Sequence, residues 1–316
     1  MGELGKVTAP GTLRIERRLP GSIEEVWTYL TDSTKRGKWL APGEMELKVG
    51  GRVELKFQHA DLSPHVESPP EKYKDLENGD TVHGRITQLD PPHLLSFTWG
   101  EASDSSEVTF QLKAEGADVL LTVTQRRLSD RGEMCNVASG WHTHLDILLD
   151  NLHGRTPRGF WSAHSEVQQE YERVLPREKA IVRVSRDFAA PAERVFDAWI
   201  EPGVVSKWLF KTPNGTIVRA EIDARAGGSY SIVDRREEGD VEHRGTYLEF
   251  DRPRRLVFTV QVPKYSEEVD CVAIDIVPTS TGCNLVLTHE LSPEWLEQTR
   301  HGWETLFDAL AQALRV

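Results

Sequence analysis

Histidine and carboxylate side chains gather in one short stretch of the chain, GWHTHLDILLDNLHG at residues 140–154. On a helix, His142 and Asp146 are four residues apart and share a face, and so do Asp146 and Asp150. Zinc ligands must converge on one point, as the histidines of H-E-x-x-H do, and this stretch lacks that spacing. We therefore expect a solvated polar face here, with no metal and no cofactor.

Two further histidines, His83 and His243, precede a glycine in two similar segments. An imidazole that points into a cavity could orient a polar group of a ligand or act as a general base. A structural histidine on a strand is the other interpretation, and it is favoured. The chain contains no G-x-S-x-G nucleophile elbow, no P-loop and no dinucleotide fingerprint. We assign no catalytic residue, and a protein that is not an enzyme is the better expectation.

The composition limits the class of protein. The chain of 316 residues is 38% hydrophobic and 28% charged, which is typical of a soluble globular protein. Its net charge of −12 argues against a nucleic-acid partner, since such binding needs lysine and arginine to meet phosphates. No segment is typical of a signal peptide or a membrane span, so we expect a cytoplasmic protein. Cys135, Cys271 and Cys283 are expected to be buried free thiols, although the last two could be neighbours across a hairpin.

One segment of the chain occurs twice. Lys38-Trp39-Leu40 recurs as Lys207-Trp208-Leu209, and the offset is 169 residues (208 − 39). A Gly-Gly pair, a long strand-like segment and a closing Gly-Trp helix then follow in the same order in both halves. These landmarks are Gly50-Gly51 and Gly227-Gly228, residues 79–99 and 239–260, and residues 140–152 and 302–314. Matched landmarks in one order indicate a duplicated domain.

Both copies predict the same elements. Ser22 and Glu25 form the S-x-x-E capping box of a first helix. Residues 52–57, RVELKF, alternate apolar and charged side chains, as a half-buried strand does. The closing helix carries apolar residues in one stripe from Trp141 to Leu152. About six antiparallel strands with helices on one face predict an α+β domain in each copy.

We expect the first domain at residues 1–155 and the second at residues 179–316, with a boundary near residues 176–180. A helical linker at residues 156–178 should extend the closing helix of the first copy. The first copy also contains an insertion, LSPHVESPPEKYKDLENG at residues 62–79, which has only a short counterpart in the second copy. A long loop rich in proline and charge is often a lid or a partner surface, and disorder is the alternative.

The Lys-Trp-Leu after the first helix, the Gly-Gly before an alternating strand and the Gly-Trp of the last helix resemble the START/Bet v1-like superfamily (SRPBCC). Within it, the chain is most similar to the group related to the C-terminal domain of the activator of Hsp90 ATPase. The resemblance implies a helix-grip fold, in which a curved antiparallel sheet wraps around a long C-terminal helix. It also implies a cavity between them for a bulky hydrophobic molecule.

Aromatic residues at the expected sheet–helix interface either line this cavity or fill a core, and sequence alone does not separate the two. The candidate cavity residues are Trp39, Phe57, His83, Trp99, Trp141 and Leu145 in the first copy, and Trp208, Tyr230, His243, Phe258, Trp303 and Phe307 in the second.

Three functions are consistent with this resemblance. The first is non-catalytic binding of a lipid-like or polyketide-like molecule. START-like proteins of actinomycete enediyne and polyketide clusters use such binding in antibiotic biosynthesis, transport or self-resistance. The alternative is a START-like polyketide cyclase, aromatase or dehydratase, for which His83, His243 or Asp146 would have to point inward. The third is a co-chaperone of an Hsp90-type ATPase. The sequence leaves the oligomeric state open.

Overall fold

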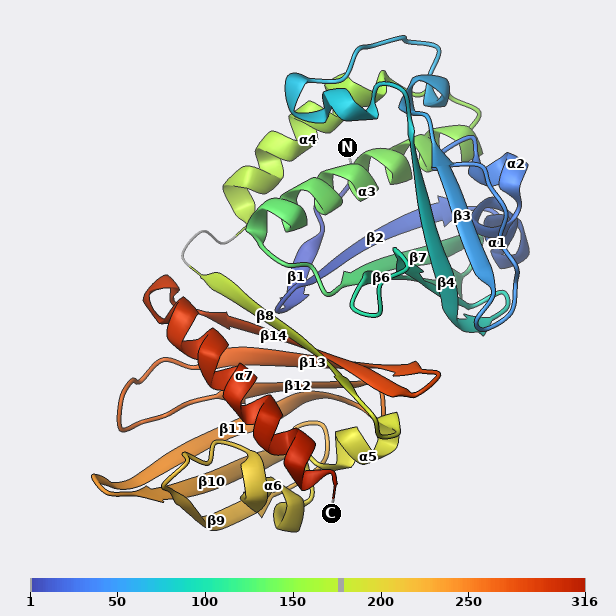
Figure 1. Cartoon of the computed structure of the whole chain (residues 1–316). Helices are drawn as coiled ribbons and strands as arrows, with labels where there is room; N and C mark the ends of the chain where they lie inside the picture. Colours follow the sequence, from blue (N-terminus) through green and yellow to red (C-terminus); the bar gives the residue numbers. More distant parts are fainter. Residues whose placement is uncertain (1, 176–178, 316) are drawn as a thin grey trace. The chain divides into compact units, whose positions relative to one another are not determined.

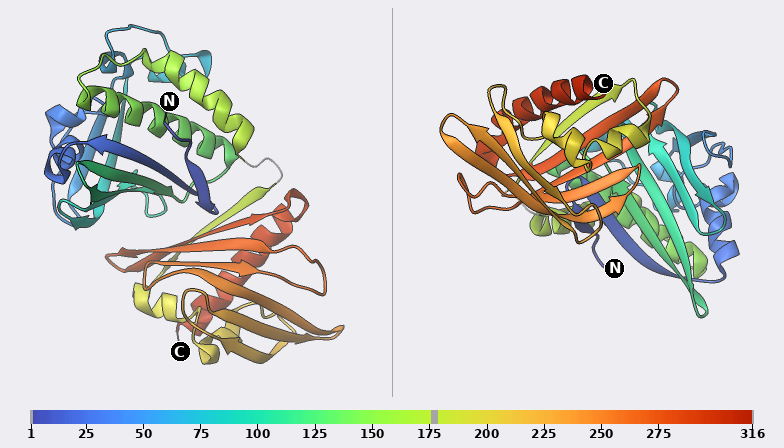
Figure 2. Two further views of the ribbon diagram at one scale, coloured as in Figure 1. Left: turned by 180° about the vertical axis from the view of Figure 1, so that it is seen from behind. Right: turned by 90° about the horizontal axis from the view of Figure 1, so that it is seen from below.

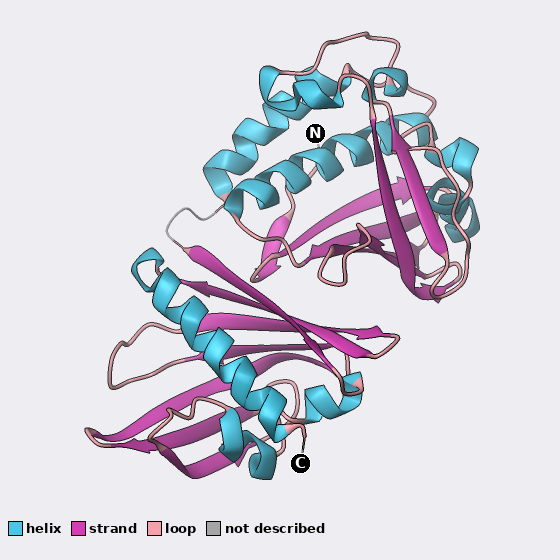
Figure 3. Cartoon of the chain, in the orientation of Figure 1, coloured by secondary structure: helices cyan, strands magenta, loops and turns pink. Residues whose placement is uncertain are grey.

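The computed structural model describes residues 2–175 and 179–315. These residues divide into two compact units. The first unit, here called the first domain, contains residues 2–8 and 12–175, and the second domain contains residues 9–11 and 179–315. Each domain is a seven-stranded sheet with helices packed on one face, which confirms the predicted α+β class and the duplication (Figures 1 and 3).

The sheet of the first domain has the order β1-β2-β7-β6-β5-β4-β3, and its neighbours from β2 to β3 pair antiparallel. Its strands are β1 (Lys6–Ala9), β2 (Thr12–Pro20), β3 (Arg52–Phe57), β4 (Asp80–Asp90), β5 (Leu94–Trp99), β6 (Ser106–Glu115) and β7 (Asp118–Arg126). Its helices are α1 (Ile23–Thr31), α2 (Ser33–Arg36), α3 (Arg131–Leu152) and α4 (Phe160–Val174), with 3-10 turns η1 (His59–Leu62) and η2 (Glu71–Leu76).

The sheet of the second domain repeats this arrangement in the order β8-β14-β13-β12-β11-β10-β9. Its strands are β8 (Ala180–Phe188), β9 (Thr216–Ile222), β10 (Ser229–Arg236), β11 (Gly239–Asp251), β12 (Arg255–Val260), β13 (Asp270–Thr279) and β14 (Gly282–Leu291). Its helices are α5 (Ala192–Asp197), α6 (Pro202–Trp208) and α7 (Leu296–Ala313), with a 3-10 turn η3 (Pro293–Trp295). The long helix α7 lies on one face of this sheet, as the opposite views in Figures 1 and 2 show.

Local sequence signals account for these elements. The side chain of Ser22 accepts a hydrogen bond from the Glu25 amide and begins α1, as the capping box predicts. In the same way, Asp130 accepts from the Glu133 amide at 2.8 Å and begins α3. Strand β3 buries Val53, Leu55 and Phe57 and turns the residues between them away from the core. The amphipathic patterns therefore place α3 and the strands so that their apolar faces meet.

The helix expected within residues 156–178 differs from the prediction. It is α4, which does not extend α3, because residues 153–159 separate the two helices. The ring of Tyr171 on α4 packs edge-on against His142 of α3, with ring centroids 5.9 Å apart. Residues 176–178, where we expected the domain boundary, lie outside the described residues, so the exact boundaries stay a prediction.

Cys135, Cys271 and Cys283 form no disulfide in the described structure; Cys135 and Cys283 are buried as expected, and Cys271 is half-buried. Cys271 on β13 lies opposite Glu290, and Cys283 on β14 lies opposite Pro278, so the register does not pair the two cysteines. Within the described residues, the structure contains no helix that is both long enough and apolar enough to cross a membrane.

Candidate ligand-binding cavity

The first domain encloses a cavity of about 250 Å³ between its sheet, α3, α4 and the segment of residues 58–79. The walls come from elements far apart in the sequence, because the sheet curves around α3 and α4 lies beside it (Figure 1). The lining residues are Leu40, Phe57, His59, Tyr73, Leu76, Asp80, Val82, Trp99, Gln125, Asn136, Val137, Gly140, Trp141, His144, Phe160, Trp161 and His164.

Aromatic rings form the sheet side of this cavity. Phe57 of β3 and Trp99 of β5 have ring centroids 5.6 Å apart, and Trp99 meets Trp141 of α3 edge-on at the same distance. The Trp141 Nε1–H donates to Gln125 Oε1 at 2.7 Å, so the buried indole keeps a hydrogen-bond partner. These contacts form a wide aromatic wall in which the buried Trp141 N–H has a hydrogen-bond partner.

The segment of residues 58–79 and helix α4 form the opposite side. Tyr73 stacks on Trp161 of α4 with ring centroids 5.5 Å apart and an angle of 23°. The Tyr73 hydroxyl donates to Asn136 Oδ1 of α3 at 3.0 Å, and Lys72 Nζ donates to the same oxygen at 2.7 Å. The Ser162 amide donates to Glu67 Oε2 at 2.9 Å. The insertion is therefore an ordered cover that is anchored on both helices.

Three histidines lie among these rings. His144 Nδ1 is 2.7 Å from the Trp39 carbonyl oxygen, and the His144 ring is 5.6 Å from that of His59. Burial is the largest cause that lowers the pKa of each imidazole, to about 3 for His144 and about 4 for His59 and His164. The three rings are therefore neutral at pH 7.

The cavity is neutral apart from its margin. Among the lining residues that the structure describes, Asp80 carries the only charged side chain, and it is exposed. No lysine or arginine is among the described lining residues, and the Lys72 ammonium that donates to Asn136 Oδ1 is exposed, so a carboxylate or phosphate would find no buried countercharge there. The walls suit an uncharged molecule.

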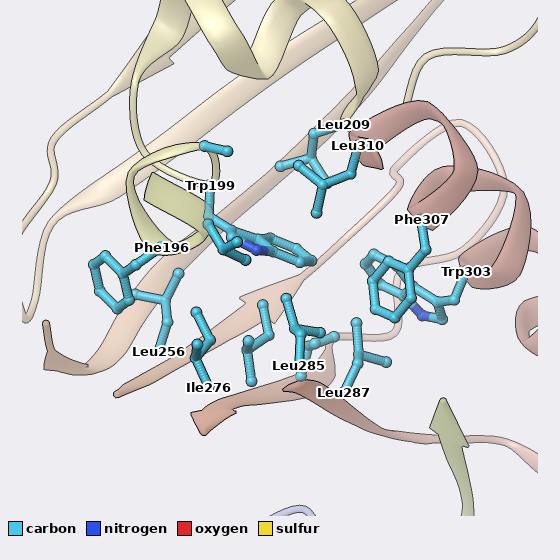
Figure 4. Packing of buried hydrophobic residues seen from close by; sticks show 14 of the residues in the cluster. Phe196, Trp199, Leu209, Leu256, Ile276, Leu285, Leu287, Trp303, Phe307 and Leu310 are labelled. Atoms are coloured by element: carbon cyan, nitrogen blue, oxygen red, sulfur yellow. The ribbon is translucent and has the colours of Figure 1, made fainter. Parts of the chain in front are cut away.

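The second domain has the same fold but a filled interior. Its core leaves a space of about 10 Å³, which is lined by Trp199, Leu209, Tyr230, Tyr247, Leu256 and Phe258. Figure 4 shows Trp199 among the core leucines, with Phe307 and Trp303 of α7 to its right. A space of this size holds about one water molecule, so this domain offers no comparable cavity in the part of the chain described.

Equivalent hydrogen bonds align the two domains and show which larger residues fill the core of the second. The Trp39 Nε1–H donates to the Tyr29 carbonyl, and the Trp208 Nε1–H donates to the Ala198 carbonyl, so both pairs keep the offset of 169. By that offset, Trp199 stands where the first domain has Leu30, and Phe210 where it has Ala41. On the closing helix, Phe307 replaces Leu145 at the offset of 162 that relates Trp303 to Trp141. Larger side chains in the second copy thus fill its core, and Phe210 packs against His243 and against Trp303, the counterpart of Trp141.

The two histidines that precede a glycine do not occupy equivalent positions. A Cβ at Gly84 would collide with the Thr98 carbonyl oxygen, and one at Gly245 with that of Thr259, so these two glycines correspond (245 − 84 = 161). By this offset, His243 corresponds to Val82 and not to His83.

The expectation that His83 lines the cavity is therefore corrected. Side chains alternate along a strand, and Val82 faces the cavity, so its neighbour His83 is exposed and lies opposite Glu54. His243 points inward but stacks flat on Phe210, with ring centroids 4.4 Å apart and an angle of 6°. It belongs to the filled core of the second domain.

The other predicted residues divide into lining and core. Phe57, Trp99 and Trp141 line the first cavity, whereas Trp39 and Leu145 are buried in the packing behind it. Tyr230 and Phe258 line the small space of the second domain. Trp208, Trp303 and Phe307 are buried in its core.

The expected solvated polar face on α3 is wrong for its histidines. His142 and His144 are both buried, because α4 covers the face of α3 that carries His142 and the cavity takes the other. His142 lies between Tyr171, whose hydroxyl is 3.3 Å from Nδ1, and Asp146, whose Oδ2 is 3.5 Å from Nε2. Asp146 in turn accepts a hydrogen bond from Arg17 at 3.3 Å. Burial lowers the pKa of His142 to about 4.

The positions of these residues test the cyclase alternative and the possibility of a metal site. His83 is exposed, His243 is stacked in a core and Asp146 is paired with Arg17, so the acid–base residues expected for a cyclase do not meet in a cavity. The described residues contain no group of three or more His, Cys, Asp or Glu side chains that could hold a metal ion.

Sequence reasoning missed much of the cover. His59, Tyr73, Phe160, Trp161 and His164 all line the cavity, yet they come from the 3-10 turn before the insertion, from the insertion and from the segment taken as a linker. A usable signal was present, because Phe160-Trp161 and His164 lie one helical turn apart and form an aromatic stripe on α4.

Comparison with known proteins agrees with this fold. A family model described as "Activator of Hsp90 ATPase homolog 1-like protein" matches residues 20–153 and again residues 189–315. No curated protein matches the chain.

Several solved structures are similar to part of the chain. A solution NMR structure of a protein from Bordetella parapertussis is 38% identical and covers 56% of this chain and 92% of its own, with a TM-score of 0.48. A crystal structure of a protein from Nitrosomonas europaea is 26% identical and covers 43% of this chain and 94% of its own, with a TM-score of 0.38. The solution NMR structure of an AHSA1-like protein from Aeromonas hydrophila is 17% identical, with coverages of 43% and 92% and a TM-score of 0.39.

The two family-model matches together span well over half of the chain, and they coincide with the two copies of the repeated fold. The chain therefore belongs to the family of Activator of Hsp90 ATPase homolog 1-like proteins, as a tandem of two such domains.

Proposed function

We propose that the first domain binds a bulky, mostly apolar small molecule in its cavity without changing it chemically. The observation that carries this proposal is the contrast between the two copies. One fold leaves about 250 Å³ open in the first domain and about 10 Å³ in the second. Well-packed proteins rarely keep such a space without a use, since unfilled volume reduces stability.

The size and walls of the cavity indicate the kind of ligand. An engineered apolar cavity of about 150 Å³ is enough to bind benzene, so the larger space here suits a fused-ring molecule. The flat rings of Phe57, Trp99, Trp141 and Trp161 can stack on such a ligand. The proposed ligand is therefore an aromatic or polycyclic molecule.

Fluorescence titration tests this proposal directly. Trp99, Trp141 and Trp161 line the cavity, so a hydroxyanthraquinone that enters it should quench tryptophan emission and raise the melting temperature. A Cβ at Gly140 would meet no atom within 4 Å in the described structure, and Gly140→Leu should therefore fill the cavity and abolish both effects. Gly302→Leu is the matched control, because Gly302 is the exposed counterpart in the second domain (302 − 140 = 162). The absence of any binding to the wild-type protein would refute the proposal.

A natural-product setting gives this binding a biological use. A polyketide or enediyne-type product would have the ring size and polarity that the cavity suits, and binding would serve its biosynthesis, transport or self-resistance. The neighbouring genes test this part of the proposal, since a biosynthetic cluster is expected beside the gene.

A co-chaperone role is the second candidate, and the family match is the observation that favours it. It predicts that the chain binds an Hsp90-type ATPase and accelerates ATP hydrolysis. A coupled ATPase assay with the purified bacterial Hsp90-type protein tests it, and an unchanged rate at saturating concentrations of this chain would exclude the role.

A further inference from the structure

The polar atoms of the cavity restrict the class of ligand further than its size does, and His144 is the first of them. A backbone carbonyl oxygen only accepts hydrogen bonds, so the 2.7 Å contact with Trp39 O requires a hydrogen on His144 Nδ1. A neutral imidazole has one N–H, and therefore Nε2 of His144 presents a lone pair. Nε2 has no hydrogen-bond partner among the described residues, and the side chain lines the cavity.

Two neighbouring imidazoles are also incompletely satisfied. Nδ1 of His164 and Nδ1 of His59 are buried without a hydrogen-bond partner in the part of the chain described, and the His164 side chain is only 4% exposed. A buried polar atom without a partner is destabilising, and a ligand that supplies the missing hydrogen bond recovers that loss. Polar atoms of this kind lie at one end of an otherwise aromatic cavity.

The charge of the walls excludes another class of ligand. No cationic side chain lines the cavity among the described residues, and the acidic Asp80 lies at its margin. The Lys72 ammonium donates to Asn136 Oδ1 but is exposed, so a fatty acid or another carboxylate would bury its charge without a buried countercharge, whereas an uncharged hydroxyl needs only an acceptor. His144 Nε2 is such an acceptor.

We propose that the cavity selects uncharged fused-ring aromatic molecules that carry a hydrogen-bond donor, such as a phenolic hydroxyl, which Nε2 of His144 accepts. This inference rests on the proposed function, because it names the ligand class for the same cavity. The contact with the Lys38-Trp39-Leu40 motif positions the acceptor, since the Trp39 carbonyl fixes the tautomer. The second domain has no counterpart, because Leu306 replaces His144 at the offset of 162.

Three matched probes test this selectivity by calorimetry on the full-length chain. 2-Naphthol is an uncharged donor, 2-methoxynaphthalene has the same rings without a donor, and 2-naphthoate is an anion at neutral pH. We expect 2-naphthol to bind about tenfold more tightly than 2-methoxynaphthalene, since one hydrogen bond to a buried acceptor is worth about that factor. 2-Naphthoate should bind most weakly.

Two variants locate the acceptor. His144→Phe keeps a flat ring but removes both nitrogens, and His144→Leu introduces the residue of the second domain. Both variants should lose the preference for 2-naphthol over 2-methoxynaphthalene. If either variant fails to fold, the other and the three probes on the wild type still decide the question.

The outcomes separate this inference from the proposed function. If no naphthalene binds to the wild type, the proposed function fails and this inference fails with it. If 2-methoxynaphthalene or 2-naphthoate binds as tightly as 2-naphthol, or if His144→Phe keeps the preference, the cavity binds aromatics but the assigned acceptor is wrong.

Discussion

The Nδ1 atom of His144 lies 2.7 Å from the backbone carbonyl oxygen of Trp39, although the two residues are 105 positions apart in the sequence. This contact links the Lys38-Trp39-Leu40 motif after the first helices to the closing helix α3. The same tryptophan also donates its indole N–H to Tyr29, which holds the motif in place. A segment that closes one end of the sheet thus supports a side chain of the cavity.

Burial of neutral histidines predicts a pH-dependent stability. The pKa values of His144, His59 and His164 lie at about 3 to 4 in the folded protein and near 6.5 when unfolded. The unfolded chain therefore binds more protons below pH 6.5, and stability is present above that pH and is lost as the pH falls toward 4. The free energy of unfolding should fall by about 1 kcal/mol per pH unit for each such histidine.

Urea unfolding between pH 7.5 and pH 4.5 measures this slope. The charged groups that act on these rings are Asp80, which raises the pKa of His59, and Lys72, which lowers that of His164. His144→Leu removes one contribution, so its slope should be shallower than that of the wild type. Equal slopes in the two proteins would contradict the neutral, buried state of His144.

A glycine on the closing helix predicts opposite effects on stability and binding. Gly140 lies inside α3 and lines the cavity, and a Cβ there would meet no atom within 4 Å in the described structure. Gly140→Ala should raise the free energy of unfolding by about 0.5 to 1 kcal/mol, because alanine favours the helix. It should also weaken ligand binding, because the methyl group occupies part of the cavity.

Gly302→Ala is the control for this pair of effects. Gly302 holds the matching position on α7, where a Cβ would also find open space, but its surface is exposed. It should gain similar stability and leave 2-naphthol binding unchanged. Parallel urea unfolding and calorimetry on both variants decide between these expectations, and equal loss of binding in the two would show that the cavity of the first domain is not the site.

The anchor of the cover predicts a kinetic effect. Asn136 accepts hydrogen bonds from both Lys72 and Tyr73, and it holds the segment of residues 58–79 against α3. Asn136→Ala should release this contact, and the dissociation rate of 2-naphthol in stopped-flow fluorescence should rise about fivefold. Tyr73→Phe keeps the stack on Trp161 and loses one hydrogen bond, so its dissociation rate should lie between those of the wild type and Asn136→Ala.

The same segment offers a control at Lys74. This side chain is exposed and pairs with Glu71 within the segment. Lys74→Ala removes a charge from the cover without touching α3 and should leave the dissociation rate unchanged. A rate in Asn136→Ala that equals the wild-type rate would mean that the cover does not control ligand exit.

The features of the fold that depend on local sequence patterns could be predicted from the sequence. The repeat, the capping boxes and the alternation of Val53, Leu55 and Phe57 determine the sheet and place Phe57 on the inner face. The stripe on the closing helix likewise places Trp141 toward the sheet. Each of these signals is local, so it survives without knowledge of the rest of the fold.

The rest of the cavity depends on register and on irregular segments. His83 and His243 look alike in sequence, but a difference of one residue in their position before the glycine turns their side chains to opposite faces. His59 and Tyr73 lie on 3-10 turns in an irregular segment without a hydrophobic period, so no local pattern predicts where their side chains point. Trp161 lies on a helix whose packing against α3 is a tertiary contact.

A single substitution is expected to open a cavity in the second domain. Phe210 occupies the position of Ala41 and stacks on His243 at 4.4 Å, with Trp303 at 6.0 Å. Phe210→Ala therefore restores the residue of the first domain and should leave a new cavity beside an imidazole. The cost should be about 3 to 4 kcal/mol of unfolding free energy, as for other buried aromatic truncations.

Calorimetry with 2-naphthol measures the consequence, because the reopened space should appear as a second, weaker binding event. Phe210→Leu is the matched comparison, since it removes the ring but leaves most of the volume filled, and it should give no second event. Circular dichroism confirms that both variants fold. A folded Phe210→Ala protein with unchanged stoichiometry would mean that the neighbouring side chains collapse into the space, and that the residue at this position alone does not determine which copy binds a ligand.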